Sequence, residues 1–171
     1  MLFAKQGCLL ESINEFKING IINAANGIGI MGAGIAGAIK NAGGKQIQDN
    51  ARKVCAQFKP KVGDAYMTTS GTLIKQGVKC IIHAVVMGQP GSLTSYEIVK
   101  HAFISAIEQA IICKISVLGT TALGTGVGSL NCKKVAAIMY NVAQNYNNID
   151  IVFVDFKSEF ISIIQQLDKC K

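Results

Sequence analysis

Short apolar runs alternate along the chain with longer segments in which apolar residues recur every three or four positions. The apolar runs are typical of strands buried on both faces, whereas the periodic segments predict amphipathic helices. This alternation predicts an α/β fold in which helices cover a largely parallel sheet. We expect strands at residues 1–6, 20–24, 64–70, 78–86, 115–119 and 149–155, and helices at residues 34–42, 45–57, 94–113, 133–145 and 158–167.

One stretch carries most of the candidate chemistry: residues 21–39, which read IINAANGIGIMGAGIAGAI. It begins as an apolar strand, passes Asn23 and Asn26, crosses a run of glycines and becomes helical. Gly32 and Gly34 let the backbone approach a ligand closely. The helix that follows begins with unpaired N–H groups and the positive end of its dipole, both of which favour phosphate. The stretch therefore predicts a site for a phosphate-bearing ligand.

Residues 32–37 also match G-x-G-x-x-G, the dinucleotide fingerprint of a Rossmann domain. That fingerprint requires a second strand ending in an acidic residue about 20 positions further on. Here residues 45–57 predict a helix, with Asp49 inside it. The context disfavours a Rossmann-type NAD-binding protein but leaves it open as an alternative.

A second glycine loop, at residues 120–129, follows another predicted strand. Taken alone, it could be a tight turn between a strand and a helix. Because ligands bind beyond the carboxyl ends of strands in α/β sheets, we expect both loops to line one crevice. Backbone N–H groups at residues 32–35 and 125–128 could then hold a diphosphate from two sides without a basic side chain. The single arginine, Arg52, lies in a predicted helix away from both loops.

The net charge of +7 suits an anionic ligand or nucleic acid. The lysines are scattered, however, and form only short pairs such as Lys133-Lys134. This distribution is more typical of a solubilising surface than of a nucleic-acid-binding patch. Nucleic acid is therefore a disfavoured partner, kept as an alternative.

The cysteines and histidines do not have the spacing of a zinc site, so we expect no metal and no cofactor. His83 lies in a predicted buried strand, where a hydrogen-bonded core histidine is expected. No apolar run reaches the roughly 18 residues of a membrane span, and the N-terminus does not resemble a signal peptide. These features predict a cytoplasmic protein with no membrane partner. The six cysteines are Cys8, Cys55, Cys80, Cys113, Cys132 and Cys170.

The strand-and-loop sequence IINAAN at 21–26, followed by MGAGIAGAI at 31–39, resembles the signature of the macrodomain family of ADP-ribose-binding modules. The likeness is greatest to small stand-alone prokaryotic members with a Met-Gly-x-Gly loop. It continues, in family order, at IIHAV (81–85) and LGTGVG (123–128). The resemblance implies a single macrodomain over residues 1–171, with a three-layer α/β/α fold and a mixed six- or seven-stranded sheet flanked by helices.

The resemblance further implies that the ligand is ADP-ribose, a derivative of it, or an ADP-ribosylated protein. Asn26 matches the second asparagine of the family motif, which holds the distal ribose and helps to position a water, so Asn26 is the expected catalytic residue of any turnover. Asn23 matches the first asparagine, a bracing amide that is counted with the site. The other ligand-binding residues implied by the resemblance are Cys8, Leu9, Ala24, Gly32, Ala33, Gly34, Ile35, Ala36, Gly124, Thr125, Gly126, Val127 and Gly128.

Several positions depart from the family pattern. Cys8 stands where members usually carry an aspartate that reads adenine, and Gly128 where an aromatic residue often covers the distal ribose. Ala36 replaces the aspartate of one hydrolytic branch, and Ala33 the lysine of another. Loss of the aspartate removes the obvious general base. Two functions therefore stay open: a non-catalytic reader of ADP-ribose, and an enzyme that hydrolyses mono-ADP-ribose linkages or deacetylates O-acetyl-ADP-ribose.

Overall fold

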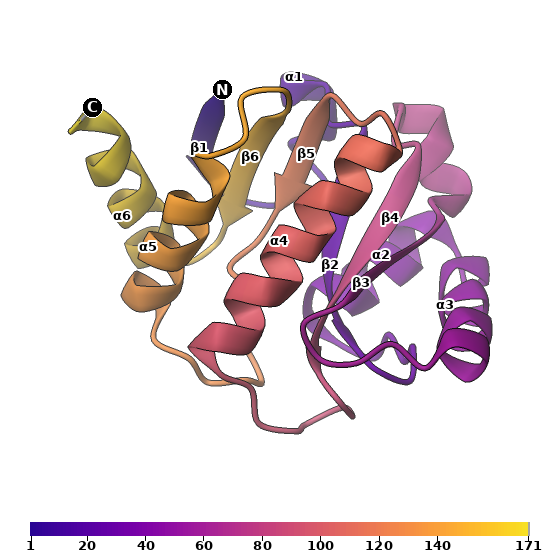
Figure 1. Cartoon of the computed structure of the whole chain (residues 1–171). Coiled ribbons are helices and arrows are strands. Elements are labelled where there is room, and N and C mark those ends of the chain that lie inside the picture. Colours follow the sequence, from indigo (N-terminus) through magenta and orange to yellow (C-terminus); the bar gives the residue numbers. More distant parts are fainter. Residues whose placement is uncertain (171) are drawn as a thin grey trace.

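A computed structural model describes residues 1–170 and contains one mixed sheet between two layers of helices (Figure 1). The strand order is β1-β6-β5-β2-β4-β3. Neighbouring strands run parallel except for β3, which pairs antiparallel with β4 at the edge. The predicted α/β class and mixed sheet are confirmed, with six strands. The strands are β1 (Leu2–Gln6), β2 (Gly20–Asn26), β3 (Ala65–Thr69), β4 (Cys80–Met87), β5 (Val117–Thr120) and β6 (Asp150–Asp155).

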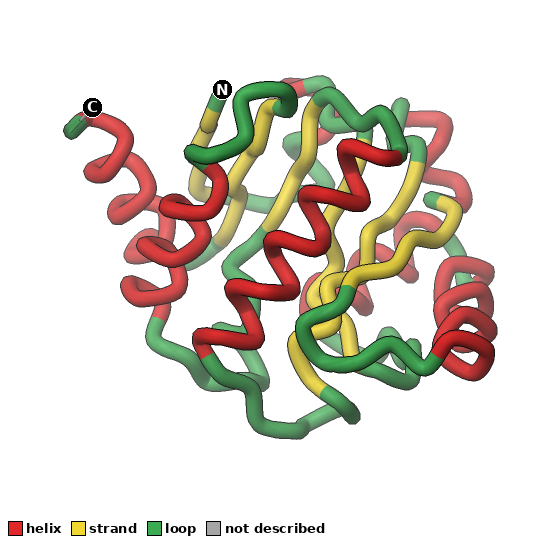
Figure 2. The backbone as a smooth tube through the Cα atoms, viewed as in Figure 1, coloured by secondary structure: helices red, strands yellow, loops and turns green. Residues whose placement is uncertain are grey.

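The helices divide between the two faces of the sheet (Figure 2). In the view of Figure 1, α4 and α5 cross in front of the sheet, and α2 lies behind it. No helix among residues 1–170 is both long and apolar enough to cross a membrane. The helices are α1 (Ile13–Phe16), α2 (Gly34–Gly43), α3 (Gln46–Phe58), α4 (Tyr96–Ile112), α5 (Cys132–Ala143) and α6 (Ser158–Lys169), together with the 3₁₀ helix η1 (Gly71–Gln76).

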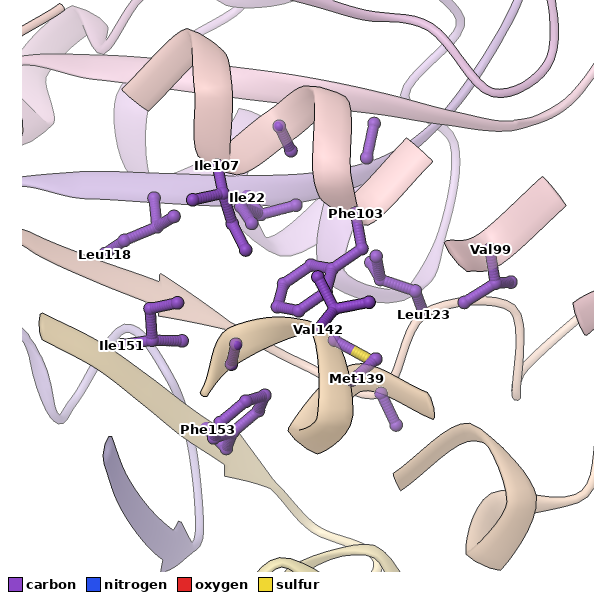
Figure 3. Packing of buried hydrophobic residues seen from close by; sticks show 14 of the residues in the cluster. Ile22, Val99, Phe103, Ile107, Leu118, Leu123, Met139, Val142, Ile151 and Phe153 are labelled. Atoms are coloured by element: carbon purple, nitrogen blue, oxygen red, sulfur yellow. The ribbon is translucent and has the colours of Figure 1, made fainter. Parts of the chain in front are cut away.

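The larger core fills the space between the sheet and the helices α4, α5 and α6. Phe153 of β6 lies at its centre, with the rings of Phe103 and Phe160 centred 6.2 and 6.1 Å away. Figure 3 shows Phe103 of α4 and Met139 of α5 converging on this region. Each such side chain stabilises the fold by about 1.5–3 kcal/mol through burial. A smaller core, which includes Met31 and Ile39, packs α2 against the other face.

Most elements lie where the apolar pattern predicts them, and the differences have local causes. β2 continues to Asn26, two residues further than expected. β5 begins at Val117 rather than at residue 115, because the N–H of Ile115 donates to Ala110 and closes the end of α4. The short α1 and η1 were not predicted as helices. Residues 46–58 form a helix, so the second strand required by the Rossmann interpretation is absent there, and that interpretation is wrong.

A buried chain of polar side chains links β2, β4 and the edge strand β3. His83 of β4 lies 3.0 Å from the amide nitrogen of Asn23 and 2.8 Å from the hydroxyl of Thr68. Tyr66 of β3 stacks on its ring at 4.7 Å, nearly parallel. Burial lowers the pKa of His83 to about 3, so its imidazole is neutral in the folded protein. His83 is therefore the hydrogen-bonded core histidine that the sequence predicts.

This depressed pKa makes the stability of the fold depend on pH in acid. The unfolded chain binds a proton at His83 near pH 6.5, whereas the folded chain does not until about pH 3. The contribution of neutral His83 to the free energy of unfolding is therefore complete above pH 6.5. It decreases as the pH falls, by up to about 1.4 kcal/mol per pH unit. Urea unfolding between pH 4 and 7.5 measures this slope. The variant His83→Gln lacks the titrating group and should show a shallower slope; equal slopes would contradict the assignment.

Candidate functional site

A cavity of about 350 Å³ opens at the carboxyl ends of β2 and β4, beside the start of α2. Three loops surround it, following β2, β4 and β5 in turn. Its walls are formed by Ala24, Ala25, Asn26, Ile30, Gly32, Ala33, Gly34, Ile35, Ala36, Val86, Met87, Pro90, Gly91, Gly124, Gly126 and Val127. Segments about 100 residues apart in the sequence therefore meet at one edge of the sheet, as the two glycine loops predict.

Asn26 builds the first loop, which spans residues 27–33. Its side-chain oxygen accepts hydrogen bonds from the N–H groups of Ile28 (3.3 Å) and Ile30 (3.1 Å). Its amide nitrogen donates to the carbonyl oxygen of Ile30 at 2.8 Å. The side chain is 7% exposed and also borders the cavity. One of the two amide hydrogens is used within the loop, so the second can donate to a ligand.

The same loop is fixed from behind by α3. Gly29 adopts a φ of +73°, and a Cβ there would lie 2.6 Å from the backbone of Ala51. The N–H of Met31 donates to the side chain of Gln48 at 2.8 Å, and the Met31 side chain is buried in the smaller core. These contacts leave the next residues facing the cavity. A Cβ built at Gly34, whose φ is +58°, meets no atom within 4 Å.

The amino end of α2 faces the cavity without a cap. Ala33 is the N-cap residue, and no side chain accepts a hydrogen bond from the first turn. The first turn also holds no acidic residue, and the N–H of Gly37 is the one that bonds back to Ala33. The N–H groups of Gly34, Ile35 and Ala36 have no acceptor within the helix. They form, together with the helix dipole, a seat for an anion.

The loop after β4 forms a wall that the sequence analysis did not assign to the site. The N–H of Gly27 lies 3.0 Å from the carbonyl oxygens of both Met87 and Gly88, which joins this loop to the first one. Pro90 and Gly91 then border the cavity. The sequence did contain one signal for this wall, which is its position: a loop containing glycine and proline follows the strand that pairs with β2.

The second glycine loop is held in place by two residues at and just after the end of β6. The carboxylate of Asp155 accepts from the N–H groups of Ala122 (3.0 Å) and Lys157 (2.9 Å). The ammonium group of Lys157 donates to the carbonyl oxygen of Thr125 at 2.6 Å and to its hydroxyl at 3.0 Å. Sequence reasoning did not find these two charged residues, although Asp155 ends, and Lys157 follows, a buried strand that reaches the same edge of the sheet.

The remaining expected site residues do not border the cavity. Asn23 pairs with His83 inside the sheet, and Leu9 is 2% exposed in the smaller core. Cys8 precedes Leu9 in the loop after β1 and is half-buried. The Thr125 side chain faces Lys157, and a Cβ at Gly128 would lie 2.5 Å from Thr94. Gly128 is thus a close-packed turn position with no space for a larger side chain.

No charged side chain of the described residues lines this cavity. Its walls offer apolar groups, backbone N–H groups and the amide of Asn26. Such a wall can hold an anion through neutral dipoles, and the residues that line it include neither a carboxylate nor an imidazole. Within residues 1–170, no group of three or more His, Cys, Asp or Glu side chains could hold a metal ion.

Comparison with known proteins gives a family and a fold. The family model described as Macro domain matches residues 22–139. An uncharacterized protein of Aquifex aeolicus is 38% identical over 126 residues, which cover 74% of this chain and 72% of that protein. One from Aeropyrum pernix is 32% identical over 127 residues, covering 74% of this chain and 64% of that protein.

Solved structures show the same architecture. The macrodomain of Mycobacterium tuberculosis DarG superposes with a TM-score of 0.79 at 22% identity, covering 90% of this chain and 97% of that one. A mutant of the Oceanobacillus iheyensis macrodomain, solved with ADPR, has a TM-score of 0.79 at 23% identity and covers 99% and 91% of the two chains.

The anchoring of the second loop by Lys157 can be tested by hydrogen exchange. We expect Lys157→Met to accelerate amide exchange at residues 122–130 about fivefold, because two partly exposed hydrogen bonds worth about 1 kcal/mol together are lost. Lys169→Met, in the last turn of α6, removes the same charge without touching the loop. Equal exchange at residues 122–130 in both variants and the wild type would contradict the anchoring role.

Proposed function

The chain belongs to the macrodomain family, and on that premise we propose that its cavity binds ADP-ribose, free or attached to a target protein. The observation that carries the proposal is that the uncapped start of α2 and the second glycine loop border the same cavity. We propose that Gly34, Ile35 and Ala36 supply one set of backbone N–H donors to a ligand, and that Gly126 and Val127 supply the other. A diphosphate fits between two such sets of neutral donors.

The cavity also suits the distal part of this ligand. Ala24 and Val86 supply small or apolar walls, and the spare amide hydrogen of Asn26 can donate to a ribose hydroxyl. The Oceanobacillus iheyensis macrodomain, which shares the fold, has been solved with ADPR and with ADP. We propose that the loop after β1 meets the adenine, with Leu9 bracing this loop from the core and Cys8 contributing through its backbone.

Binding without rapid turnover is the function that this site supports best. Hydrolysis requires a group that takes a proton from the attacking water, and neither acidic nor imidazole side chains line the described cavity. Ala36 occupies the position at which one hydrolytic branch carries its aspartate. We therefore propose a reader of ADP-ribose or of ADP-ribosylated proteins as the primary function.

A second function, hydrolysis of mono-ADP-ribose linkages or deacetylation of O-acetyl-ADP-ribose, is supported by one specific observation. Asn26 borders the cavity and keeps an amide hydrogen free while the first loop holds its side chain in a single orientation. An amide so fixed can position a water or a ribose hydroxyl, with a phosphate of the substrate accepting the proton. This route needs no protein base and would be slow.

Calorimetric titration with ADP-ribose tests the binding site. Gly34→Glu should abolish binding, because the carboxylate would lie where the diphosphate is proposed to lie. Gly34→Ala should retain binding, since a methyl group at this position meets no atom within 4 Å. Both variants carry the same backbone strain of about 1 kcal/mol from a side chain at positive φ.

Gly77→Glu is the matched control for charge and strain. Gly77 has a φ of +91° and open space around it, and it does not border the cavity. It should bind ADP-ribose like the wild type. Wild-type affinity in Gly34→Glu would refute the placement of the diphosphate. Affinity for an oligonucleotide that ADP-ribose does not displace would instead support the nucleic-acid alternative.

Whether the protein is a reader or an enzyme is tested by measuring the rate of ADP-ribose release at saturating substrate. We expect little or no release of ADP-ribose from a mono-ADP-ribosylated protein, and Asn26→Ala should remove any residual rate. Because this substitution also deletes three loop hydrogen bonds, Asn26→Asp serves as a second variant: it keeps the acceptor oxygen and loses the donor. Rapid turnover in the wild type would overturn the reader assignment, and an unchanged rate in both variants would refute the role of Asn26.

A further inference from the structure

Three sulfur atoms meet at the end of the sheet opposite the cavity. The thiol of Cys113 lies 3.0 Å from the thioether sulfur of Met67. Cys113 also lies close enough to the buried Cys80 to raise the pKa of its thiol. Cys80 begins β4, whereas the cavity lies at the other end of that strand, roughly 23 Å away at 3.3 Å per residue. This sulfur cluster, Met67, Cys80 and Cys113, is thus separate from the proposed ADP-ribose site.

The fold fixes the position of each member. In the antiparallel pairing of β3 with β4, Met67 lies opposite Ile82, so it shares a face of the sheet with Cys80, two residues earlier. That face is covered by α4, whose C-cap residue is Cys113. Two neighbouring strands and one helix end therefore each contribute one sulfur, and the cluster does not depend on a long loop.

The cluster is buried on one side and open on the other. Cys80 is 2% exposed, Cys113 is half-buried, and Met67 is 43% exposed. A small ion can therefore reach the sulfurs from solvent and be covered by the core behind Cys80. Burial, together with the neighbouring Cys113, raises the pKa of the Cys80 thiol to about 12, so this thiol is protonated when no ion is bound.

We propose that Met67, Cys80 and Cys113 form a binding site for a soft monovalent d¹⁰ metal ion, of which Cu(I) is the natural example. Thiolates and thioethers together select such ions, whereas Zn²⁺ sites use thiolate, imidazole and carboxylate ligands. Three sulfurs placed about 2.3 Å from one ion stand about 4 Å apart. The sulfurs of Met67 and Cys113, which lie 3.0 Å apart, would therefore separate by about 1 Å on binding. Each thiol that binds the ion releases its proton to solvent.

The thioether distinguishes this site from a disulfide. Oxidation of Cys80 and Cys113 by a peroxide or a disulfide reagent would join two sulfurs and make no use of Met67. A thioether held against a thiol at an open surface adds a third donor of the type that Cu(I) prefers. The metal site therefore accounts for all three sulfurs.

The test is an anaerobic competition titration of the reduced, full-length chain with Cu(I) held by a chromogenic chelator. The wild type should bind one Cu(I) with near-ultraviolet thiolate-to-copper absorption. Met67→Leu conserves volume and should lower the affinity about tenfold, and Cys113→Ser should lower it further. Cys170→Ser, which removes an exposed cysteine elsewhere, should not change it.

Thermal unfolding and ADP-ribose titration of each variant show whether the fold is intact, and neither depends on copper. Equal Cu(I) affinity in Met67→Leu and the wild type would overturn the three-sulfur site, even if Cys113→Ser folded poorly. Zn²⁺ binding as tight as Cu(I) binding would also overturn it. So would a reduced protein that takes up no Cu(I) but forms a Cys80–Cys113 disulfide with diamide.

Discussion

The parallel pairing of β2 with β4 is the interaction on which both the fold and the site depend. It runs in register from Gly20 opposite Cys80 to Ala25 opposite Val85, and then shifts at Asn26. Both strands are buried on both faces, so their side chains contribute to the two cores at once. Because the strands are parallel, the loops that follow them leave the sheet at the same edge and form two walls of one cavity.

The register shift has a direct structural consequence for the site. At that point the pairing skips one residue of β4, so that Asn26 lies opposite Met87, and the side-chain amide of Asn26 organises residues 28–30. The N–H of Gly27 meanwhile bonds to the loop after β4. A single asparagine thus ends the strand, shapes the first loop and faces the cavity. Its structural and ligand-facing roles cannot be separated by an alanine substitution alone, and an aspartate at this position separates them better.

Most of the fold could be predicted from the sequence, because each buried strand is a short apolar run and each long helix has a clear period. The errors fell where side chains or helix ends override that pattern. Residues 115–116 look like a strand, but the carbonyl oxygen of Ala110 and the side chain of Asn19 hold their N–H groups in a turn. The short α1 and η1 contain too few residues to show any period.

The candidate site could be predicted only as far as its glycine loops. Their motifs are local, so Gly32, Gly34 and Gly126 could be found by inspection. The wall formed by Pro90 and Gly91, and the support given by Lys157, depend on contacts between residues far apart in the chain. Asn23 and Leu9 illustrate the opposite limit: a motif position can be occupied by a residue whose side chain is committed to the core.

Much of the cavity wall is formed by glycine and alanine, which determines how mutations can affect it. An alanine scan removes side-chain atoms, yet at Ala24, Ala33 and Ala36 there is nothing to remove. At Gly32 and Gly126, alanine adds one methyl group into open space. Such a scan would report on Asn26 and on larger apolar side chains such as Ile30, Ile35 and Met87, but it would leave the glycine and alanine part of the site silent. Substitutions that add bulk or charge would detect it, so natural loss of function here should arise by gain of side-chain atoms.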